Sequence, residues 1–412
     1  MGEYFRRFWQ PVALSRELPA PDCAPRRVQV MGENLLLFRD TDGQVGLIEP
    51  RCPHRGADLF YGRNEACGIR CVYHGWKFDV TGRCLERPNM PAKDPYRDRI
   101  RIKAYPTSEF GDLVWAYMGP EGASAKVPQL EFGVVPATHR YVTKKLQRCN
   151  WAQALEGAID TAHTSFLHMP APTIRHDGER LLIPADQKRL GWIRDDTSPR
   201  LTVVEHAAGF VVGGARNAGD KEIYWRVAQF LLPSHSSTPA AFPGENYYGY
   251  TWVPITDEAC WMYTYVWNPE QPISAEDRQR FDAGYNVISA VDSEFVPLRN
   301  KSNEYMLDRE EQRNVSYTGV RGVAEQDTMI QESLGPIADR TQEHLTVTDA
   351  AIVRFRQIML AGAKSLAEGT EPSAPGRPLD YRTRSGGWVA DSSVPFEEVM
   401  NQRFGDPVGR VA

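Results

Sequence analysis

The 412-residue sequence lacks several features that would assign it to a large class of proteins. It has no apolar run long enough to span a bilayer, and its first residues, MGEYFRRFWQPV, lack the apolar core of a signal peptide. Neither charge sign dominates, since 48 Lys and Arg face 53 Asp and Glu, and no basic stripe recurs along the chain. These absences argue against a membrane protein, a secreted protein and a nucleic-acid-binding protein.

Cysteine is also scarce. The seven cysteines are spread from Cys23 to Cys260, and this odd, sparse set does not resemble the disulfide framework of a small secreted domain. The sequence therefore predicts a protein of the reducing cytoplasm.

The length and the 42% of hydrophobic residues predict two domains, with at least one sizeable core. After a short N-terminal helical segment, β-branched and aromatic runs broken by Gly, Pro and Asp predict an all-β domain over residues 1–130. Within it, Asp42-Gly43 is the signal of a two-residue hairpin turn. The small and Pro residues of MGPEGASAKVP mark its end.

The remaining residues, 131–412, mix helical and strand patterns. The segment 151–168 has the pattern of a helix, and NYYGYTWVPITDEACWMYTYVW predicts two strands around a turn. Further helices are expected after the capping residue Ser274 and near Thr348. From Glu371 the chain is rich in Pro, Gly and Ser and is expected to lie on the surface. We predict an α+β domain, an antiparallel sheet with helices against it.

Two short clusters of metal-binding residues lie in the first domain. Cys52-x-His54 and Cys71-x2-His74 are sixteen residues apart, on turns rich in Gly, Pro and Arg. Structural zinc sites, which are the alternative, usually take like ligands from each turn. Here each turn supplies one Cys and one His. That mixture suits a two-iron two-sulfur cluster with two thiolates on one iron and two imidazoles on the other, as in a Rieske centre.

The residues around these clusters resemble the Rieske motif of aromatic ring-hydroxylating oxygenases, including the run Tyr-His-Gly-Trp that contains His74. Cys67 lies four residues before Cys71, but no histidine pairs with it, and we interpret it as a small buried hydrophobe. The resemblance implies that the cluster is held by Cys52, His54, Cys71 and His74.

A second set of metal-binding residues lies in EGAIDTAHTSFLHMP, at Asp160, His163 and His168. On a regular helix Asp160 and His163 would share a face, whereas His168 would lie roughly 140° round from His163. The helix is therefore expected to distort or end between the histidines, with Pro170 soon after. Ordinary packing or exposure is the alternative for an isolated pair, but four of the nine histidines fall in two ligand-spaced sets.

This second set resembles the mononuclear iron motif that accompanies the Rieske motif in these oxygenases. Two imidazoles and a carboxylate on one side of Fe(II) leave positions for dioxygen and substrate. Spacing alone does not choose the carboxylate among many downstream acids. The resemblance places it at Asp327, in GVAEQDTMIQESL, with Glu325 and Glu332 as competitors.

The resemblance covers most of the chain and points to the phthalate 4,5-dioxygenase branch, which includes phenoxybenzoate dioxygenase and O-demethylases of lignin-derived biaryl acids. It implies a Rieske domain, a helix-grip catalytic domain, and a ring of three subunits or two stacked rings. In such a ring Asp160 would bridge His74 of one subunit to His163 of its neighbour, because the two metal sites of one chain are expected to lie too far apart for rapid electron transfer. Members often begin with further residues, so an N-terminal truncation is left open.

The implied function is that of a terminal oxygenase. A flavin and iron-sulfur reductase would pass electrons from NADH or NADPH through the cluster to the iron, for dihydroxylation of a phthalate-like or phenoxybenzoate-like aromatic acid by O2. Oxidative O-demethylation of a methoxylated aromatic acid uses the same ligands and is the alternative. A Rieske electron carrier and a zinc-stabilised binding protein are alternatives of another class.

An aromatic acid needs a cation to hold its carboxylate, and arginine can do so with two hydrogen bonds. Four arginines lie in the region expected to line the pocket, and the sequence gives no reason to choose among Arg194, Arg200, Arg216 and Arg226.

Overall fold

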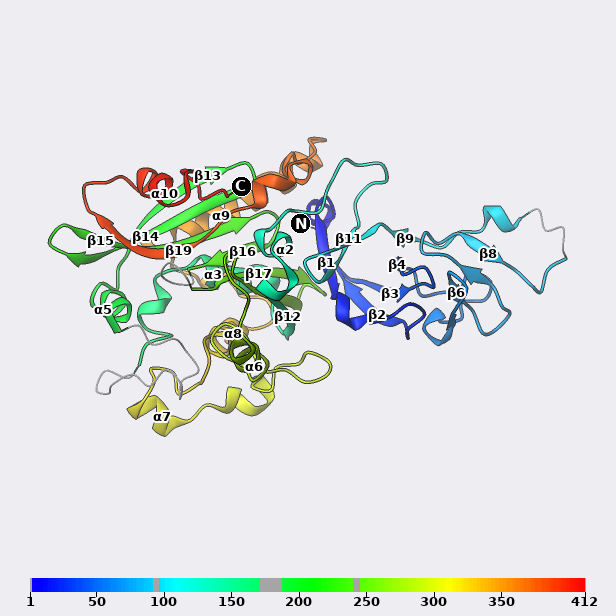
Figure 1. The fold of residues 1–412 in the computed structure, drawn as a ribbon, viewed down its shortest axis with the longest axis horizontal. Helices are drawn as coiled ribbons and strands as arrows, with labels where there is room; N and C mark the ends of the chain where they lie inside the picture. The colour runs from blue at the N-terminus through cyan, green and yellow to red at the C-terminus, as the bar shows by residue number, and fades with distance from the viewer. Residues whose placement is uncertain (1, 92–95, 171–186, 240–244, 412) are drawn as a thin grey trace. The chain divides into compact units, whose positions relative to one another are not determined.

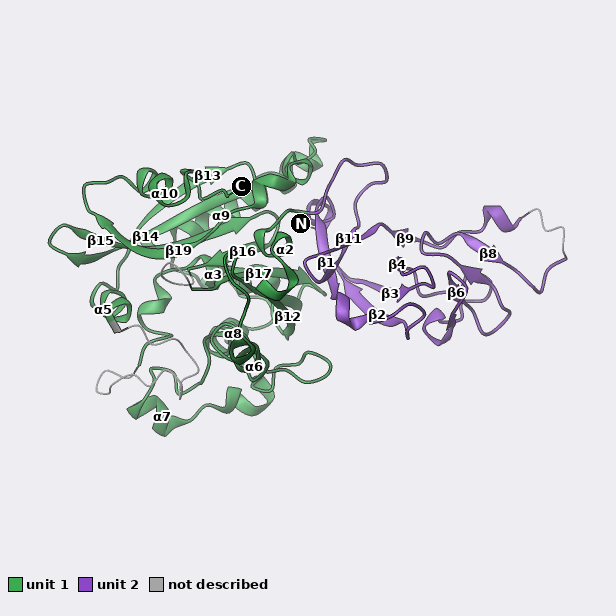
Figure 2. Ribbon diagram, viewed as in Figure 1, with its two compact units in different colours: residues 1, 128–412 green, residues 2–127 purple. Residues whose placement is uncertain are grey.

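Two compact units make up the chain in the computed structural model, which describes residues 2–91, 96–170, 187–239 and 245–411. Figure 1 shows the fold and Figure 2 the division, with one unit at residues 2–127 and the other from residue 128 onward. Within the described ranges, no helix combines the length and the apolar composition that crossing a membrane requires.

Antiparallel sheets form most of the first unit, as its short β-branched and aromatic runs predict. A short helix, α1 (Gly2–Phe5), precedes them. The described strands pair as β1 (Trp9–Leu14), β11 (Leu113–Tyr117) and β10 (Thr107–Phe110); as β2 (Arg26–Val30), β3 (Glu33–Arg39), β4 (Val45–Ile48) and β9 (Ala104–Tyr105); and as β5 (Arg63–Asn64), β6 (Ile69–Arg70), β7 (Lys77–Phe78) and β8 (Cys84–Glu86). The prediction of an all-β domain is confirmed.

The hairpin between β3 and β4 has a wider loop than the predicted two-residue turn. The Asp40 amide donates to the Gln44 carbonyl at 2.9 Å, so the loop consists of Thr41, Asp42 and Gly43. Gly43 has a φ of +81°, the left-handed conformation that completes a three-residue hairpin loop. The Asp40 side chain accepts hydrogen bonds from the amides of Asp42 (3.0 Å) and Gln44 (2.8 Å), which stabilises this wider loop.

One apolar core connects the second and third sheets of this unit. Phe38 of β3 packs in the same cluster as Ile69 of β6 and Phe78 of β7. Cys52 and Cys71 belong to this cluster as well. The loops that carry the predicted cluster ligands are therefore anchored in the core at their cysteines.

A large antiparallel sheet forms the second unit. Its described strands run in the order β12 (Arg140–Gln147), β18 (Cys260–Trp267), β17 (Tyr247–Pro254), β16 (His235–Thr238), β15 (Glu222–Leu231), β14 (Gly209–Gly219) and β13 (Arg200–His206). β17 and β18 are the two strands predicted from the aromatic run, and they pair directly. The predicted α+β class is confirmed.

Helices accompany this sheet. In chain order the described ones are α2 (Glu131–Val134), α3 (Trp151–Ile159), α5 (Gln187–Asp195), α6 (Ala275–Asp282), α7 (Arg309–Asn314), α8 (Val323–Ser333), α9 (Ala350–Ala367) and α10 (Phe396–Phe404). α3 packs on β15, β16 and β17 and contacts α8 and α9 (Figure 1). The predicted cap of α6 is confirmed, because the Ser274 hydroxyl accepts from the Asp277 amide at 2.9 Å. The helix expected near Thr348 begins at Ala350.

The C-terminal segment does not lie on the surface as predicted. Its strand β19 (Gly386–Asp391) pairs with Glu222–Val227 of β15, next to the part of β15 that pairs with β16. Helix α10 then buries Phe396 and Met400 against β14 and β15. The prediction of exposure came from the Pro and Gly content of the segment. It failed because composition does not show that the few apolar residues of the segment lie where they can pack against the sheet.

Candidate metal centres and substrate pocket

Two loops with the same backbone frame carry the predicted cluster ligands. In each loop the cysteine amide donates to the carbonyl five residues on, at 2.9 Å for Cys52 and 2.8 Å for Cys71. The cysteine carbonyl accepts from the glycine amide four residues on, at 2.8 Å for Gly56 and 2.9 Å for Gly75. Both glycines have a positive φ, +75° and +77°, which residues with a Cβ rarely adopt. In each loop, two backbone hydrogen bonds of the cysteine thus close a tight turn.

The two cysteines of these loops are buried and interact with each other. Cys52 is 1% exposed and Cys71 is 3% exposed. Burial raises the pKa of the Cys52 thiol to about 11, although the amides of His54 and Arg55 oppose the shift. A thiol in this setting becomes a thiolate when a metal replaces its proton, so the pair suits a metal cluster.

The histidines of the same loops lie side by side. The rings of His54 and His74 are 4.3 Å apart between centroids, edge to face, and His54 stacks on Trp76 at 4.7 Å. Within the described residues, the buried Nδ1 of His54 has no hydrogen-bond partner. A buried nitrogen without a partner is costly unless it binds something. The four residues therefore fit a cluster that is held by two thiolates and two imidazoles.

Cys67 does not behave as the buried hydrophobe that we expected. It is only partly buried, and its thiol donates to the Asp42 carboxylate at 3.3 Å. Its amide donates to the Thr41 hydroxyl at 2.9 Å. Cys67 thus makes two hydrogen bonds to the β3–β4 loop. It lies outside the two loops that carry the predicted cluster ligands.

In the second unit, the helix that leads to the predicted iron ligands ends earlier than expected. α3 ends at Ile159 and does not run on to His168. Asp160 has extended backbone angles, and its Oδ1 accepts from the Ala162 amide at 2.7 Å, a local turn that competes with the helix. Asp160 and His163 therefore do not share a helix face. A 3-10 turn that starts at His163 instead brings its Nδ1 to 3.2 Å from the Asp160 carboxylate.

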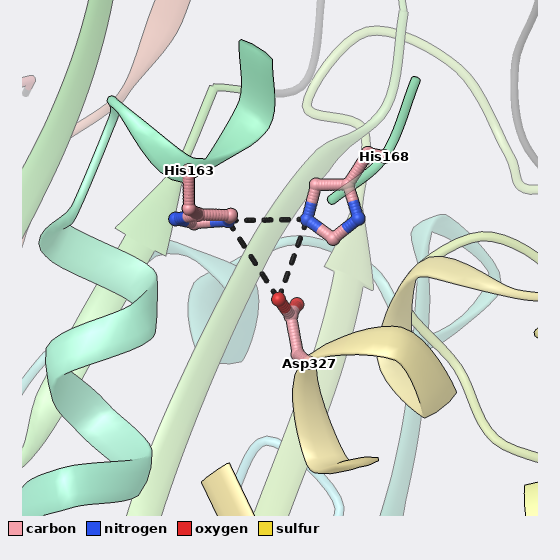
Figure 3. Close-up of side chains that lie close together, drawn as sticks. All are labelled: His163, His168 and Asp327. Atoms are coloured by element: carbon pink, nitrogen blue, oxygen red, sulfur yellow. Dashed lines mark hydrogen bonds and ion pairs between the residues drawn. The ribbon is translucent and has the colours of Figure 1, made fainter. Parts of the chain in front are cut away.

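His163, His168 and Asp327 meet in one place (Figure 3). His163 Nε2 is 3.1 Å from His168 Nε2, and Asp327 Oδ1 is 3.6 and 3.3 Å from these nitrogens. Three ligands on one face of an octahedral ion, each about 2.1 Å from it, would lie about 3.0 Å apart. The three side chains are therefore spaced as a facial triad requires. Among the described residues they are the one such group of three or more His, Cys, Asp and Glu side chains.

The charges of this group also suit a metal cation. Burial opposes ionisation of Asp327, but His168 and His163 hold the pKa of its carboxyl below the usual value. Burial likewise opposes ionisation of Asp160, and His163 lowers the pKa of that carboxyl. Both carboxylates are thus ionised at neutral pH, and two imidazoles with a carboxylate form the donor set that non-haem iron takes.

The loop before His163 is anchored by a buried arginine. Arg216 of β14 is fully buried and donates to the Thr161 carbonyl (2.6 Å), the Thr161 hydroxyl (3.1 Å) and the Asp196 carbonyl (3.0 Å). Gly214, two residues earlier, makes room for the loop, since a Cβ there would lie 2.5 Å from the Thr161 methyl carbon. The sheet therefore fixes the position of the loop that carries the histidines.

Helix α8, which carries Asp327, is held by a buried lysine of β12. Lys145 donates to the Ala324 carbonyl (3.1 Å) and the Thr328 hydroxyl (2.6 Å), on either side of Asp327 in the helix. It also donates to the Ser289 hydroxyl at 3.3 Å. These bonds fix the helix that presents the Asp327 carboxylate.

The two competing acids of α8 are placed elsewhere. Glu332 accepts from the Arg148 amide at 2.7 Å and from the Tyr305 hydroxyl at 2.6 Å. Glu325 is buried and is not part of the group around the two histidines in the described structure. Asp327 is thus the acid that α8 brings to the histidines.

A pocket lies over the three side chains and is walled by α3, α5, α8 and the sheet. Tyr248, Tyr250 and Trp252 alternate along β17 and therefore line it from one face of the strand. On the α3 side the lining residues are Ala154, Gly157 and Ala158. A Cβ on Gly157 would lie 2.4 Å from the side-chain amide nitrogen of Gln331 in α8. The aromatic wall and the small residues of α3 suit a flat ring.

The pocket distinguishes the four candidate arginines. Arg226 of β15 lines it, and the Nε atom of this side chain is buried with no hydrogen-bond partner among the described residues. Arg216 is bound to the loop before His163, Arg194 is exposed beside Asp195, and Arg200 is exposed. The sequence did not point to Arg189 of α5, which also lines the pocket.

Comparisons with known proteins agree with this geometry. The Rieske [2Fe-2S] domain family matches residues 8–106, and the family described as LigXa C-terminal domain like matches residues 116–377. The phthalate 4,5-dioxygenase oxygenase subunit of Pseudomonas putida is 39% identical over 93% of this chain and 88% of its own. This chain belongs to the Rieske oxygenases.

Two further proteins extend the comparison. The 5,5'-dehydrodivanillate O-demethylase oxygenase subunit of Sphingobium sp. is 30% identical over 91% of this chain and 79% of its own. The crystal structure of dicamba monooxygenase bound to 3,6 dichlorosalicylic acid matches the fold with a TM-score of 0.59 at 16% identity, over 88% of this chain and 98% of that one.

Membership of the Rieske oxygenases confirms the resemblance found in the motifs and makes the chain an oxygenase subunit. It contradicts the two alternatives of another class, a zinc-stabilised binding protein and an electron carrier without oxygenase activity. A signal for the pocket wall was present in the sequence, because Tyr248, Tyr250 and Trp252 alternate. The alternation does not show which face of the strand lies toward the predicted iron ligands, because that depends on how α3 packs on the sheet.

Proposed function

We propose that this Rieske oxygenase dihydroxylates an aromatic carboxylic acid, phthalate-like or phenoxybenzoate-like, with O2 and electrons from an NADH- or NADPH-dependent flavin and iron-sulfur reductase. One observation carries the proposal: Arg226 and the triad of His163, His168 and Asp327 line the same pocket. A cation and a metal-binding face in one aromatic-walled cavity are what oxidation of an aromatic acid requires.

Two sets of residues would hold the metals. Cys52, His54, Cys71 and His74 would hold the two-iron two-sulfur cluster, and His163, His168 and Asp327 would hold one Fe(II). When bound, the mononuclear iron supplies the activation of dioxygen. The residues around it fix ligand geometry: the Asp160 carboxylate, 3.2 Å from His163 Nδ1, holds the proton on that nitrogen and leaves Nε2 free to bind metal.

The pocket residues would hold the substrate. The Arg226 guanidinium would bind its carboxylate, and Arg189 is a second cation of the same pocket. Tyr248, Tyr250 and Trp252 would pack against the ring and exclude water from it. Binding at the cation would thus hold one edge of the ring toward the triad.

A second function, oxidative O-demethylation of a methoxylated lignin-derived acid, is supported by the 30% identity to the dehydrodivanillate O-demethylase subunit. It would use the same triad and the same cation, with a methoxyl carbon rather than a ring edge held toward the metal. The ring of three subunits, or two stacked rings, and the cytoplasmic location are part of the proposal.

The experiment is product analysis under ¹⁸O2. The purified chain, a reconstituted reductase and NADH are supplied with phthalates, phenoxybenzoates and methoxylated aromatic acids in turn. Dihydroxylation consumes one O2, one NADH and one proton and adds two labelled oxygens and two hydrogens to the ring. Demethylation consumes the same reagents and yields a phenol, formaldehyde and water. A product with two labels supports the first proposal, formaldehyde supports the second, and no oxidation of any aromatic acid contradicts both.

A further inference from the structure

Gln326 is a buried amide beside the predicted iron ligands. It precedes Asp327 on α8 and is 1% exposed. Its Nε2 donates to the Val320 carbonyl at 2.8 Å, and its Oε1 lies 2.8 Å from Nδ1 of His168. One side chain thus joins the helix that carries Asp327, the segment before that helix and the ring of His168.

The Val320 carbonyl determines which end of the amide faces the ring. A carbonyl oxygen can only accept, so the NH2 group of Gln326 faces Val320 and the amide oxygen faces His168. That oxygen can only accept in turn, so Nδ1 of His168 carries the ring proton. Nε2 of His168 then has a free lone pair, and it is the atom that lies 3.3 Å from Asp327 Oδ1.

The two histidines are oriented by acceptors of different charge. Their Nε2 atoms lie 3.1 Å apart, but His163 is backed by the carboxylate of Asp160 and His168 by the neutral amide of Gln326. A second carboxylate behind the histidines would add negative charge to a site that already contains Asp160 and Asp327. The amide orients the ring without that charge.

We propose that Gln326 is a positioning residue that holds His168 in the tautomer and orientation needed to bind iron. The inference rests on the iron site of the proposed function. Without an acceptor at Nδ1, the His168 ring can carry its proton on Nε2 or turn away from Asp327. Acceptors of this kind change the affinity of a site for its metal about 10- to 100-fold.

Metal binding by the full chain tests this role. Mononuclear metal is removed by chelation with the iron-sulfur cluster retained, and the bound cobalt per chain is then measured by equilibrium dialysis against Co(II). Gln326→Met fills a similar volume without an acceptor and is expected to bind Co(II) about 10- to 100-fold more weakly than the wild-type chain. Gln229→Met is the matched control, because Gln229 of β15 is an equally buried amide whose nitrogen donates to the Arg384 and Val408 carbonyls, at 3.0 and 2.8 Å.

A second variant separates positioning from packing. Gln326→Glu keeps an acceptor for His168 but turns an oxygen toward the Val320 carbonyl, so it is expected to unfold at a lower temperature and still bind Co(II) within a few-fold of the wild-type chain. If Gln326→Met binds Co(II) as tightly as Gln229→Met, or if Gln326→Met and Gln326→Glu lose affinity equally, the positioning role is wrong. If the wild-type chain itself binds no Co(II), the iron site is wrong and the inference fails with it.

Discussion

Arg226 is the single residue that should decide whether the pocket accepts a carboxylate. Arg226→Met keeps the aliphatic stem and removes the cation, so the KM for an aromatic acid should rise roughly 10- to 100-fold, because a hydrogen bond to a charged group contributes about 1.5–3 kcal/mol. The kcat should change less, since the predicted metal-binding triad is left in place. Steady-state kinetics with the reconstituted reductase measure both constants.

Arg194→Met is the control for this prediction, because Arg194 is exposed and paired with Asp195 at 2.8 Å. It should leave the KM unchanged. Equal effects of Arg194→Met and Arg226→Met would show that general charge, rather than a built carboxylate site, attracts the substrate. An unchanged KM in Arg226→Met would remove Arg226 from the substrate site.

At the same scale, chemistry and resemblance predicted more of the site than spacing did. His163 and His168 were identifiable because histidine is scarce and the two are closely spaced. Asp327 could be chosen over Glu325 and Glu332 only through the family motif, since all three acids lie on one helix. Arg226 could not be chosen from the sequence. Its position in the pocket depends on how β15 lies relative to the loop before His163, which Arg216 anchors.

Among the elements, the β13–β14 hairpin contains a histidine that should make the fold sensitive to acid. Burial lowers the pKa of His206 to about 4; Arg410 also disfavours its protonation, while Gln229, Asp380 and Asp406 favour it. Its Nδ1 accepts from the Ala208 amide at 3.3 Å, which requires the unprotonated ring nitrogen.

The sign of the pH effect follows from this lowered pKa. The unfolded chain binds a proton at His206 below about pH 6.5, whereas the folded chain does not until about pH 4. Stability is therefore lost as the pH falls through this window, by roughly 2 kcal/mol between pH 7.5 and pH 5.

His206→Asn keeps an acceptor for the Ala208 amide and should show a pH dependence smaller by that amount. Urea unfolding of both full-length proteins, followed by tryptophan fluorescence, gives the free energy of unfolding at the two pH values. The contributions of the other titrating groups cancel when the pH dependence of the variant is subtracted from that of the wild-type protein. An identical pH dependence in the two proteins would contradict the assignment.

Helices and strands were predicted correctly where the local sequence pattern was regular. The predictions failed where a side-chain hydrogen bond or a partner distant in sequence decides the structure. The alternating aromatic residues of β17 and β18 and the serine cap of α6 were recognisable from local sequence alone. α3 ends early because the Asp160 side chain takes the Ala162 amide that a continuing helix would use, and periodicity does not register such a competition. β19 was missed because its partner, the first half of β15, is far away in sequence.

For the whole molecule, the proposed ring of subunits makes a prediction that neither unit makes alone. If the cluster loops of one chain serve the triad of the next, a chain without its cluster and a chain without its iron site should complement each other. Cys71→Ala removes a predicted cluster ligand and Asp327→Ala removes a predicted ligand of the triad. Each variant alone should be inactive, and the two are co-expressed with different tags and purified through both.

A ring of three that carries both tags contains two chains of one variant and one of the other. In either composition one of the three chains keeps the triad and has a neighbour with an intact cluster on the donating side, so a single ring should recover about a third of the wild-type activity. If electrons travel within one chain, every active pocket lacks its own donor and the mixed ring stays inactive. Mixed oligomers that carry both tags and show no turnover would therefore place the electron route inside the chain, and Asp160 would lose its bridging role while keeping its contact with His163.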